Sequence, residues 1–473
     1  MRVDSTIGTK RTNSSISPPS LVAEPISDHL HHSKRLKQSS STPAATRPSS
    51  KLMTTNINDL PEAVLGEILC RLPCYKYVAQ CKSVSKRWCS LMLDPSFIGR
   101  FLCRRSDGKQ TSMTRTLINC QGEEFLTRMS SSSKPLTPLF KRLMSFHHLK
   151  EEPIVLGTYN DLVLCCASRC DQRDYYICNP YTLKWVALPP PPQVYEFTAV
   201  GFMCDLPYYN CKKNNVGGLN IQLNAEYKCR VVRLCRDDML ISSCEFKVEI
   251  FSFETGEWRE SIVSSPSMFK MSDVNSRISY AHNGMLYWMS HADNFLIGLD
   301  PFMLDNWNRT SVSSSSSSAN DGDSKHNECV FIEFGGSDNY LLGCLGVYKG
   351  CLQIGDYDYD THTVFVWELD KQVHRGAFEL RKRVYSLEWE MVPDGHYGLY
   401  LLAFDPNNDG NEGILYLSVS GGLLNQCGDI FTYNICTRKC LKIVENTPNG
   451  ILDFFPVAVP WWPTPVPRLA TRT

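Results

Sequence analysis

The sequence predicts an α+β multidomain protein in which a small all-α unit precedes a larger all-β domain, behind a disordered N-terminal segment. Residues 55–103 carry apolar side chains at helical spacing, and residues 151–460 consist of short apolar stretches separated by turn residues. Residues 1–54 are rich in Ser, Thr and Pro and show no periodicity. Such a segment buries too little apolar surface to offset the entropy lost on ordering, so we expect it to be disordered.

The composition is that of a globular chain with no excess of either charge. The 473 residues include 49 basic and 49 acidic ones, and 42% of the chain is hydrophobic. Zero net charge gives no reason to expect nucleic acid or an anionic membrane as a partner. The N-terminus builds no apolar signal-peptide core, and apolar runs such as 413–419 are too short to span a bilayer. We therefore expect a soluble protein of the nucleus, the cytoplasm or both.

A short basic cluster and two groups of cysteines each have a functional and a structural interpretation. Lys34, Arg35 and Lys37 suit a nuclear import signal or a solvated charge cluster, and the shortness of the cluster favours the second. Among the 21 cysteines, those at 165, 166 and 170 and those at 436 and 440 lie close together, but neither group has the paired C-x2-C spacing of structural zinc. We expect reduced, mostly buried thiols and no metal or other cofactor.

The all-α unit is predicted to contain three helices. Asp59, with Glu62 three residues later, is placed to cap the first helix, and Pro61 fits its first turn. A second helix is expected over about 75–82 and a third before Pro95. The first helix presents one apolar face (Val64, Leu65, Ile68, Leu69 and Leu72) that ends at Pro73, and the third presents another (Val84, Trp88 and Leu91). A unit of about 45 residues is near the lower limit for independent stability, so we expect a partner to complete its apolar face.

The β region shows two recurring half-motifs. A turn followed by a strand recurs at 160–164, 283–287 and 349–353, with a fourth copy at 397–401. A strand followed by a tight turn recurs at 177–185 and 251–258, with weaker copies at 299–301 and 433–437. Repeated strand–turn–strand units over about 300 residues predict a propeller of four-stranded blades, although the uneven spacing leaves the blade number open.

Two segments flank this region. Residues 104–150 are polar and irregular, apart from an amphipathic stretch near 140–146, and we assign them to a linker. Residues 461–473 are assigned to a C-terminal tail, in which Trp461 and Trp462 are expected to close the last blade. Trp185 and Trp258 follow tight turns on strands, where packing aromatics are commoner than binding ones.

Residues 58–97 resemble an F-box over the whole motif. The resemblance is carried by Leu60–Pro61, Ile68–Leu69, Leu72–Pro73, and by Val84, Ser85, Lys86, Trp88 and Leu91. It implies that this unit docks a Skp1-type adaptor, which in that family recruits a cullin. The residues expected to contact the adaptor are Leu60, Pro61, Leu65, Ile68, Leu69, Leu72, Pro73, Val84, Trp88 and Leu91. The same side chains also suit the core of the unit itself, and for Trp88 a core position with an exposed edge is favoured.

The downstream domain is similar to the F-box-associated domains of plant F-box proteins, which are related to kelch propellers. Asn179–Pro180 with Thr182 and Trp185, the run 255–258, and the Asn283–Gly284 strand start carry this second resemblance. Together the two resemblances imply the substrate-recognition subunit of an SCF-type E3 ubiquitin ligase, a non-catalytic receptor whose protein target the sequence does not identify.

Two other functions stay open at this point. The chain suits an adaptor-bound scaffold that does not lead to degradation, or a glycan-binding or enzymatic propeller. The enzymatic reading has little support, because the sequence lacks a G-x-S-x-G nucleophile elbow, an H-E-x-x-H zinc motif and a phosphate-binding P-loop. Asp356, Asp358 and Asp360 are read as a solvated turn rather than a calcium site.

Overall fold

The computed structural model describes residues 56–470, except for 107–114, 122–135, 169–171, 196–197, 214–218, 239, 272–273, 275–278, 291–294, 304–328, 334–342, 349, 359–362, 370–379, 387–398, 406–412, 421–427 and 448–452. The predicted disordered segment 1–54 and the basic cluster at 34–37 therefore lie outside the described residues. No helix among the described residues is long and apolar enough to cross a membrane.

The helical unit contains four α-helices: α1 (Glu62–Leu69), α2 (Tyr75–Lys82), α3 (Lys86–Leu93) and α4 (Pro95–Ser106). The second helix has the predicted bounds, whereas α4 was missed because Pro95 was read as a stop. Proline fits the first turn of a helix as well as it ends one, because no intrahelical donor is needed there. Asp94 accepts a hydrogen bond from the backbone N of Ser96, which satisfies one amide at the start of α4.

The predicted cap of α1 was wrong. The N-cap position is Pro61, which has no side-chain hydrogen bond to offer, and Asp59 instead accepts a bond from the backbone N of Asn56. Asp59 ends a short 3₁₀ turn, η1 (Ile57–Asp59). The α3 helix does have a side-chain cap, because Ser85 Oγ accepts a hydrogen bond from the backbone N of Trp88 at 3.1 Å.

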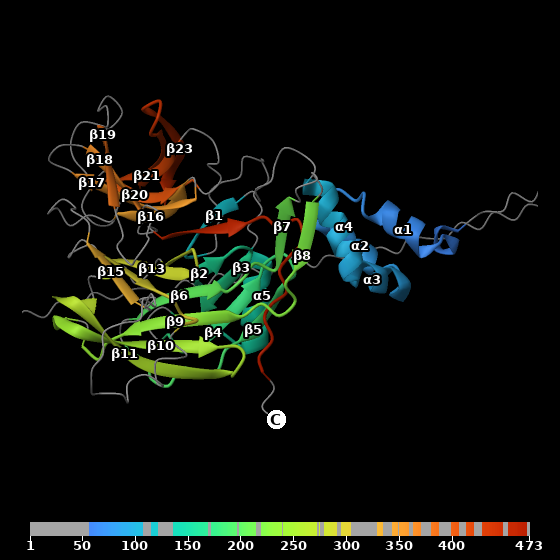
Figure 1. Ribbon diagram of the computed structural model, residues 1–473, viewed down its shortest axis with the longest axis horizontal. Coiled ribbons are helices and arrows are strands. Elements are labelled where there is room, and N and C mark those ends of the chain that lie inside the picture. The colour runs from blue at the N-terminus through green and yellow to red at the C-terminus, as the bar shows by residue number, and fades with distance from the viewer. Residues whose placement is uncertain are drawn as a thin grey trace, which may run out of the picture. The chain divides into compact units, whose positions relative to one another are not determined.

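The β region forms five four-stranded antiparallel sheets, the blades of a five-bladed propeller (Figure 1). Each sheet is built from strands that are consecutive in the chain, except that a two-stranded hairpin, β7 (Tyr209–Lys213) and β8 (Leu219–Leu223), is inserted into the second. The first blade contains β2 (Ile154–Tyr159), β3 (Leu162–Cys166), β4 (Tyr175–Asn179) and β5 (Lys184–Ala187), and the second contains β6 (Thr198–Cys204), β9 (Cys229–Cys235), β10 (Ser243–Ser252) and β11 (Glu257–Phe269). The third blade contains β12 (Tyr280–His282), β13 (Met285–Ser290), β14 (Phe295–Leu299) and β15 (Cys329–Glu333), and the fourth contains β16 (Cys344–Tyr348), β17 (Cys351–Asp358), β18 (Thr363–Leu369) and β19 (Leu380–Ser386). The fifth blade contains β20 (Leu399–Phe404), β21 (Ile414–Ser420), β22 (Gly428–Asn434) and β23 (Lys439–Thr447).

The repeated half-motifs of the sequence are the turns of these sheets. The first half-motif holds the turn between the first and second strands in three blades, where Asn160 and Asn283 have φ values of 52° and 49°. Asparagine and glycine tolerate this left-handed conformation. The second half-motif holds the turn between the third and fourth strands, where Asn179 and Asn434 each accept bonds from backbone N–H groups two and three residues later.

One copy of the first half-motif was misplaced. Leu399 begins β20, the first strand of the fifth blade, so residues 397–401 do not form the turn before a second strand. That turn lies between β20 and β21 instead. The mistake arose because a Tyr-Gly step before an apolar run looks the same in sequence at either end of a strand.

Hydrophobic clusters between neighbouring blades make the core continuous around the ring. Shared clusters join the first blade to the second, the second to the third, the third to the fourth and the fourth to the fifth. Close packing is visible at Gly201 of β6, where a Cβ atom would lie 2.6 Å from Cζ2 of Trp288 in the next blade.

A two-stranded sheet of β1 (Arg115–Asn119) and β24 (Phe454–Ala458) closes the ring. The two strands are antiparallel, with Leu117 opposite Pro456. On one side this pair packs against the fifth blade through Leu117 and Phe454, and on the other against the first blade through Ile118 and Phe455.

Residues 104–150 are therefore not the simple linker that we predicted. They contain β1 and the helix α5 (Thr137–His147), whose Leu139, Phe140 and Leu143 pack on the first blade. The amphipathic stretch predicted near 140–146 lies in this helix. The strand was missed because its burial follows from pairing with a segment more than 330 residues later, which local patterning does not register.

The C-terminal residues also differ from the prediction. Residues 461–470, which we call the C-terminal segment, do not close the last blade, because its four strands are β20 to β23 and β24 pairs with β1 to close the ring. Trp462 instead packs in the hydrophobic cluster of the helical unit, together with Tyr209 and the partly buried Leu223 of the inserted hairpin. The predicted tail is thus a packed part of the fold as far as Leu469, which contacts the cluster between the first two blades.

We predict that ring closure by β24 supports the stability of the whole propeller. Phe455→Ala is expected to lower the free energy of unfolding by about 3–5 kcal/mol, because the side chain is 1% exposed and contacts both β1 and the first blade. Urea unfolding of the full chain measures this change. Val459→Ala is the matched control, since Val459 is 41% exposed and its truncation is expected to cost no more than about 0.5 kcal/mol. Equal effects of the two substitutions would contradict the role of this strand pair.

Candidate functional site

The ten residues predicted as a docking site fall into two groups in the structure. Leu65, Leu69 and Trp88 are buried, at 0%, 3% and 7% exposure. Leu60, Leu72 and Leu91 are half-buried, whereas Pro61, Ile68, Pro73 and Val84 are exposed. The sequence placed Ile68 on the same face as its neighbours, but residues one apart point about 100° apart around a helix of 3.6 residues per turn. Positions 65 and 69 therefore face inward, while 64 and 68 face outward.

The inner face of the helical unit is filled by the chain itself. Leu65, Leu69 and Trp88 belong to one cluster with Phe97 and Phe101 of α4, and this cluster also takes in Trp462. The expectation that a partner completes this face was therefore wrong for its inner side. No local signal in the sequence pointed to Trp462 as part of this unit.

The outer face keeps large apolar side chains in solvent. We call Pro61, Val64, Ile68, Pro73, Tyr77, Val84 and Leu93 the outer apolar residues. Five of them are between 43% and 58% exposed: Val64, Ile68, Tyr77, Val84 and Leu93. Seven exposed apolar side chains on a unit of about 45 residues are typical of a protein that binds another protein there. Val64, Tyr77 and Leu93 were not among the predicted contact residues.

Backbone contacts hold the corner that leads into α1. Nη2 of Arg87 in α3 donates a hydrogen bond to the carbonyl of Leu60 at 2.7 Å, and its Nε lies 3.8 Å from a carboxylate oxygen of Glu62. Arg105 of α4 donates to the carbonyl of Leu72, at the other end of the same helix. Side chains from α3 and α4 thus bind the backbone at both ends of α1. The helix that carries Val64 and Ile68 is therefore held at each end.

The helical unit is positively charged although the whole chain is neutral. Residues 60–106 contain eight Lys or Arg residues and three Asp or Glu residues, which gives this stretch a net charge of +5. Most of these basic side chains, among them Arg71, Lys76 and Lys86, are exposed. A unit that exposes both cationic and apolar side chains complements a partner that presents an apolar groove with acidic surroundings.

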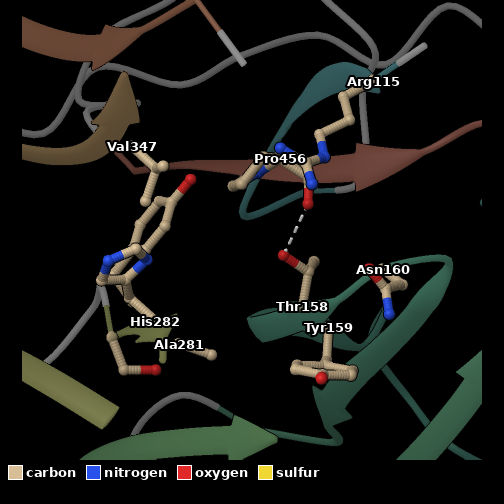
Figure 2. Close-up of a pocket in the computed structure, with 10 residues that line it drawn as sticks. Arg115, Thr158, Tyr159, Asn160, Ala281, His282, Val347 and Pro456 are labelled. Atoms are coloured by element: carbon tan, nitrogen blue, oxygen red, sulfur yellow. Dashed lines mark hydrogen bonds between the residues drawn. The ribbon is translucent and has the colours of Figure 1, made fainter. Parts of the chain in front are cut away.

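A second concave site lies where the innermost strands of several blades meet. It is a cavity of about 150 Å³ lined by residues of β1, β2, β12, β16 and β24, or adjacent to them, including Arg115, Tyr159, Tyr280 and His282 (Figure 2). Thr158 Oγ1 donates to the carbonyl of Pro456 across its wall at 2.9 Å. Its volume lies below the range of about 300–1,000 Å³ usual for ligand pockets.

The cavity offers little for hydrolytic chemistry. Its ten lining residues include no Asp or Glu, whereas glycoside hydrolysis needs a pair of carboxylates. Of the acidic residues read as a solvated turn, Asp356 is 7% exposed in β17, so that expectation was wrong for this position. Asp360 lies outside the described residues. Among the residues that the structure describes, no cluster of His, Cys, Asp or Glu has the arrangement of a metal site.

The two strand tryptophans have packing roles. Trp185 donates from Nε1 to Nε2 of His147 in α5 at 3.0 Å, and Trp258 donates to the carbonyl of Pro189 at 2.9 Å. The guanidinium of Arg233 lies 5.7 Å from the ring of Trp258 and pairs with Glu249, with both charged side chains fully buried. The cysteines of β3, Cys165 and Cys166, are likewise buried core residues.

Comparison with known proteins identifies the two parts separately. Residues 57–98 match the F-box domain family, and residues 134–308 match the family described as "F-box protein At3g26010-like, beta-propeller". F-box protein At5g49610 of Arabidopsis thaliana is 26% identical over 318 residues, which cover 64% of this chain and 77% of that protein. F-box protein At3g28330 of the same organism is 22% identical over 255 residues, which cover 52% of this chain and a little over half, 57%, of that protein.

A solved structure of oligopeptidase B from Leishmania major aligns with 64% of this chain and 35% of its own, at 9% identity and a TM-score of 0.28. That similarity is too low to carry an argument. The family matches end at residue 308, whereas the described propeller continues to β24. The kelch relation suggested by the sequence stays a prediction.

We predict that neighbouring residues of α1 differ sharply in their contribution to stability. Leu69→Ala is expected to lower the free energy of unfolding by about 2–5 kcal/mol, because it removes a buried side chain from the shared cluster. Ile68→Ala, one residue away, is expected to cost less than about 1 kcal/mol, because Ile68 is 43% exposed. Chemical denaturation of both variants tests this split, and a larger loss for Ile68 would mean that α1 is rotated relative to the structure.

Proposed function

Because the chain is an F-box protein with a C-terminal β-propeller, we propose that it is the substrate-recognition subunit of an SCF-type E3 ubiquitin ligase. In this proposal the F-box docks a Skp1-type adaptor, which links it to a cullin, and the propeller captures a protein target. The observation that carries the proposal is the set of outer apolar residues on an F-box whose inner face the chain already fills. An apolar outer face with this much exposure is costly in water unless a partner covers it.

The adaptor contact is assigned to the outer apolar residues together with the half-buried Leu60, Leu72 and Leu91. Leu65, Leu69 and Trp88 support that surface from inside rather than contact the adaptor. The net charge of the F-box favours an adaptor with an acidic surface, because opposite charges steer encounter and suppress wrong partners. Ubiquitin transfer in this arrangement needs no chemistry from the chain, which contributes proximity.

Target capture is assigned to the propeller face that carries the turns between second and third strands. In an antiparallel meander successive turns alternate between the two ends of a sheet. The end with the first-to-second and third-to-fourth turns is occupied in the first two blades, because the C-terminal segment contacts Asp161, Asn179 and Phe253 there. The opposite end is free of that segment.

The loop between β9 and β10 offers an anchoring surface at this free end. Leu240 and Ile241 are 65% and 58% exposed, and Ile241 borders a groove of about 300 Å³ that Phe246 and Ile262 also line. The guanidinium of Arg236 donates to the carbonyls of Ile241, Ser243, Glu245 and Phe269, which holds the loop in place. A fixed loop with exposed apolar tips suits recognition of a protein, since little ordering entropy is lost on binding.

Two other functions remain as alternatives. A scaffold that binds the adaptor without leading to degradation shares every structural feature of the proposed receptor, and only the response of target levels to loss of the protein separates the two. A glycan-binding or enzymatic propeller is less supported by the small cavity and its lack of carboxylates. Nuclear or cytoplasmic location stays a prediction.

We predict that the outer face of α1 is required for adaptor binding but not for folding. Val64→Ser combined with Ile68→Ser is expected to weaken binding of a purified Skp1-type adaptor by at least about tenfold, because two exposed anchors are lost. Isothermal titration calorimetry measures the affinity, and circular dichroism checks folding. Met268→Ser, which removes an apolar side chain of β11 that is 66% exposed, is the control and leaves the affinity unchanged. Failure of the wild-type chain to bind any adaptor would overturn the proposed function, while normal affinity of the folded double variant would overturn only the surface assignment.

We also predict that the β9–β10 loop selects the target. Leu240→Ser with Ile241→Ser is expected to remove specific neighbours from a proximity-labelling experiment under proteasome inhibition, with adaptor association unchanged. Leu206→Ser is the matched control, because Leu206 is 51% exposed but lies on the connection after β6, at the opposite end of that blade. Retention of all ubiquitinated neighbours by the loop variant would show that the target binds elsewhere.

A further inference from the structure

The C-terminal segment contacts both parts of the protein. The chain enters the propeller at β1 and leaves it at β24, and these two strands are paired. After β24 the chain does not end at the ring but returns to the F-box, where Trp462 is 4% exposed. The C-terminal segment forms no strand of a blade, yet Trp462 is buried. The contacts of the segment therefore show which parts of the protein it connects.

Trp462 is the contact with the F-box. Its ring centroid lies 5.2 Å from that of Tyr75 in α2 and 5.5 Å from that of Phe101 in α4, both in edge-to-face geometry. The Nζ atom of Lys82 lies 4.8 Å from the centroid of the same ring. Edge-to-face aromatic pairs and a cation over an indole face are directional contacts, so they fix an orientation as well as bury area.

Thr464, two residues later, is the contact with the propeller. Its backbone N and its Oγ1 both donate to the carboxylate of Asp161, and the carbonyl of Thr464 accepts a bond from Nδ2 of Asn179 at 2.8 Å. Asn179 Nδ2 also donates to Asp161 at 2.8 Å. Asp161 and Asn179 stand in the two tight turns of the first blade. Burial raises the pKa of Asp161, which the hydrogen bonds from Thr464 and Asn179 oppose, so the network holds the segment at the cost of a desolvated carboxyl group.

Further contacts extend the segment along the second blade. Tyr227 donates from its hydroxyl to the carbonyl of Pro465, and the backbone N of Ala470 donates to the carbonyl of Phe253 at 3.2 Å. The inserted hairpin adds Tyr209 and Leu223 to the cluster around Trp462, so two segments that are far apart in the chain, the hairpin and the C-terminal segment, reach the F-box.

From these contacts we propose that the C-terminal segment fixes the orientation of the F-box on the propeller, with Trp462 as the positioning residue. Domains joined through a small interface move relative to one another unless the contact is apolar and well packed. The purpose of this positioning rests on the proposed function. In that function, a fixed orientation holds an adaptor-bound enzyme and a captured target at a set separation. The contacts themselves do not require the adaptor.

The test measures the distance between the two parts in the full chain. Spin labels on unnatural amino acids at Ser90 of α3 and Met268 of β11, both exposed, report this distance by electron–electron double resonance without adaptor present. The wild-type chain is expected to give one narrow distribution, and Trp462→Ala to broaden its width by at least about twofold. Trp462→Phe, which keeps an aromatic ring in the cluster, is expected to restore a narrow distribution. Arg468→Ala, on the exposed side of the same segment, is the matched control and stays narrow.

A second variant keeps the test decisive if Trp462→Ala does not fold. Thr464→Val removes the hydroxyl donor to Asp161 without touching the F-box, and it is expected to broaden the distribution in the same direction. A narrow, wild-type distribution in every folded variant of residues 462 and 464 would overturn the positioning role.

Adaptor binding and ubiquitin transfer are measured separately from the distance distribution. Thr464→Val is expected to bind the adaptor within about threefold of wild type, because Thr464 is bonded to Asp161 and Asn179 of the first blade rather than to the F-box. Ubiquitin transfer to a captured target is expected to fall at least about tenfold, because the acceptor is no longer held in reach. Absence of adaptor binding by the wild-type chain would remove the proposed function and leave the distance result intact, so the two failures are distinguishable.

Discussion

The pairing of β1 with β24 is the constraint on which the rest of the structure depends. A ring of packed blades leaves an apolar face of its first blade and one of its last blade uncovered unless the first and last segments of the domain meet between them. Here strands more than 330 residues apart in sequence supply the closure, with Ile118 and Phe455 packing against the first blade. The closure also decides where the chain enters and leaves the propeller, since both points lie on the same two-stranded sheet. The start of β1 and the end of β24 are adjacent, with Arg115 opposite Ala458, and the segment after β24 reaches the F-box.

The F-box is stabilised from within the chain on one side and left open on the other. Its inner cluster is completed by Trp462 and by the hairpin β7–β8, which adds the core volume that a unit of this size lacks. The outer apolar residues are not part of this inner cluster. Their exposure is the strongest indication of a partner. The same helix, α1, serves both purposes, because positions 64 and 68 point away from positions 65 and 69. Buried and solvent-exposed apolar positions are thus adjacent in this helix.

Several features of this protein followed from local sequence. The tight turns were predictable from asparagine, which adopts the left-handed conformation at Asn160 and Asn283. At Asn179 and Asn434 its side chain accepts hydrogen bonds from the backbone of the turn. The second helix was predicted over about 75–82, which are its observed bounds, and the F-box resemblance at 58–97 falls within the family match at 57–98. These features share one property: the information that determines them lies within a few residues of where they occur.

By itself, then, the sequence determined an F-box followed by blades of antiparallel strands, because helical periodicity, turn chemistry and a short contiguous motif are local. Only the tertiary structure decided that residues 104–150 supply a closing strand and the packed helix α5, that the blades number five, and that Trp462 belongs to the F-box cluster rather than to the last blade. It also decided which residues of α1 are core and which are surface. Each of these depends on pairing or burial between segments far apart in the chain, and a residue type alone does not state which distant segment covers it.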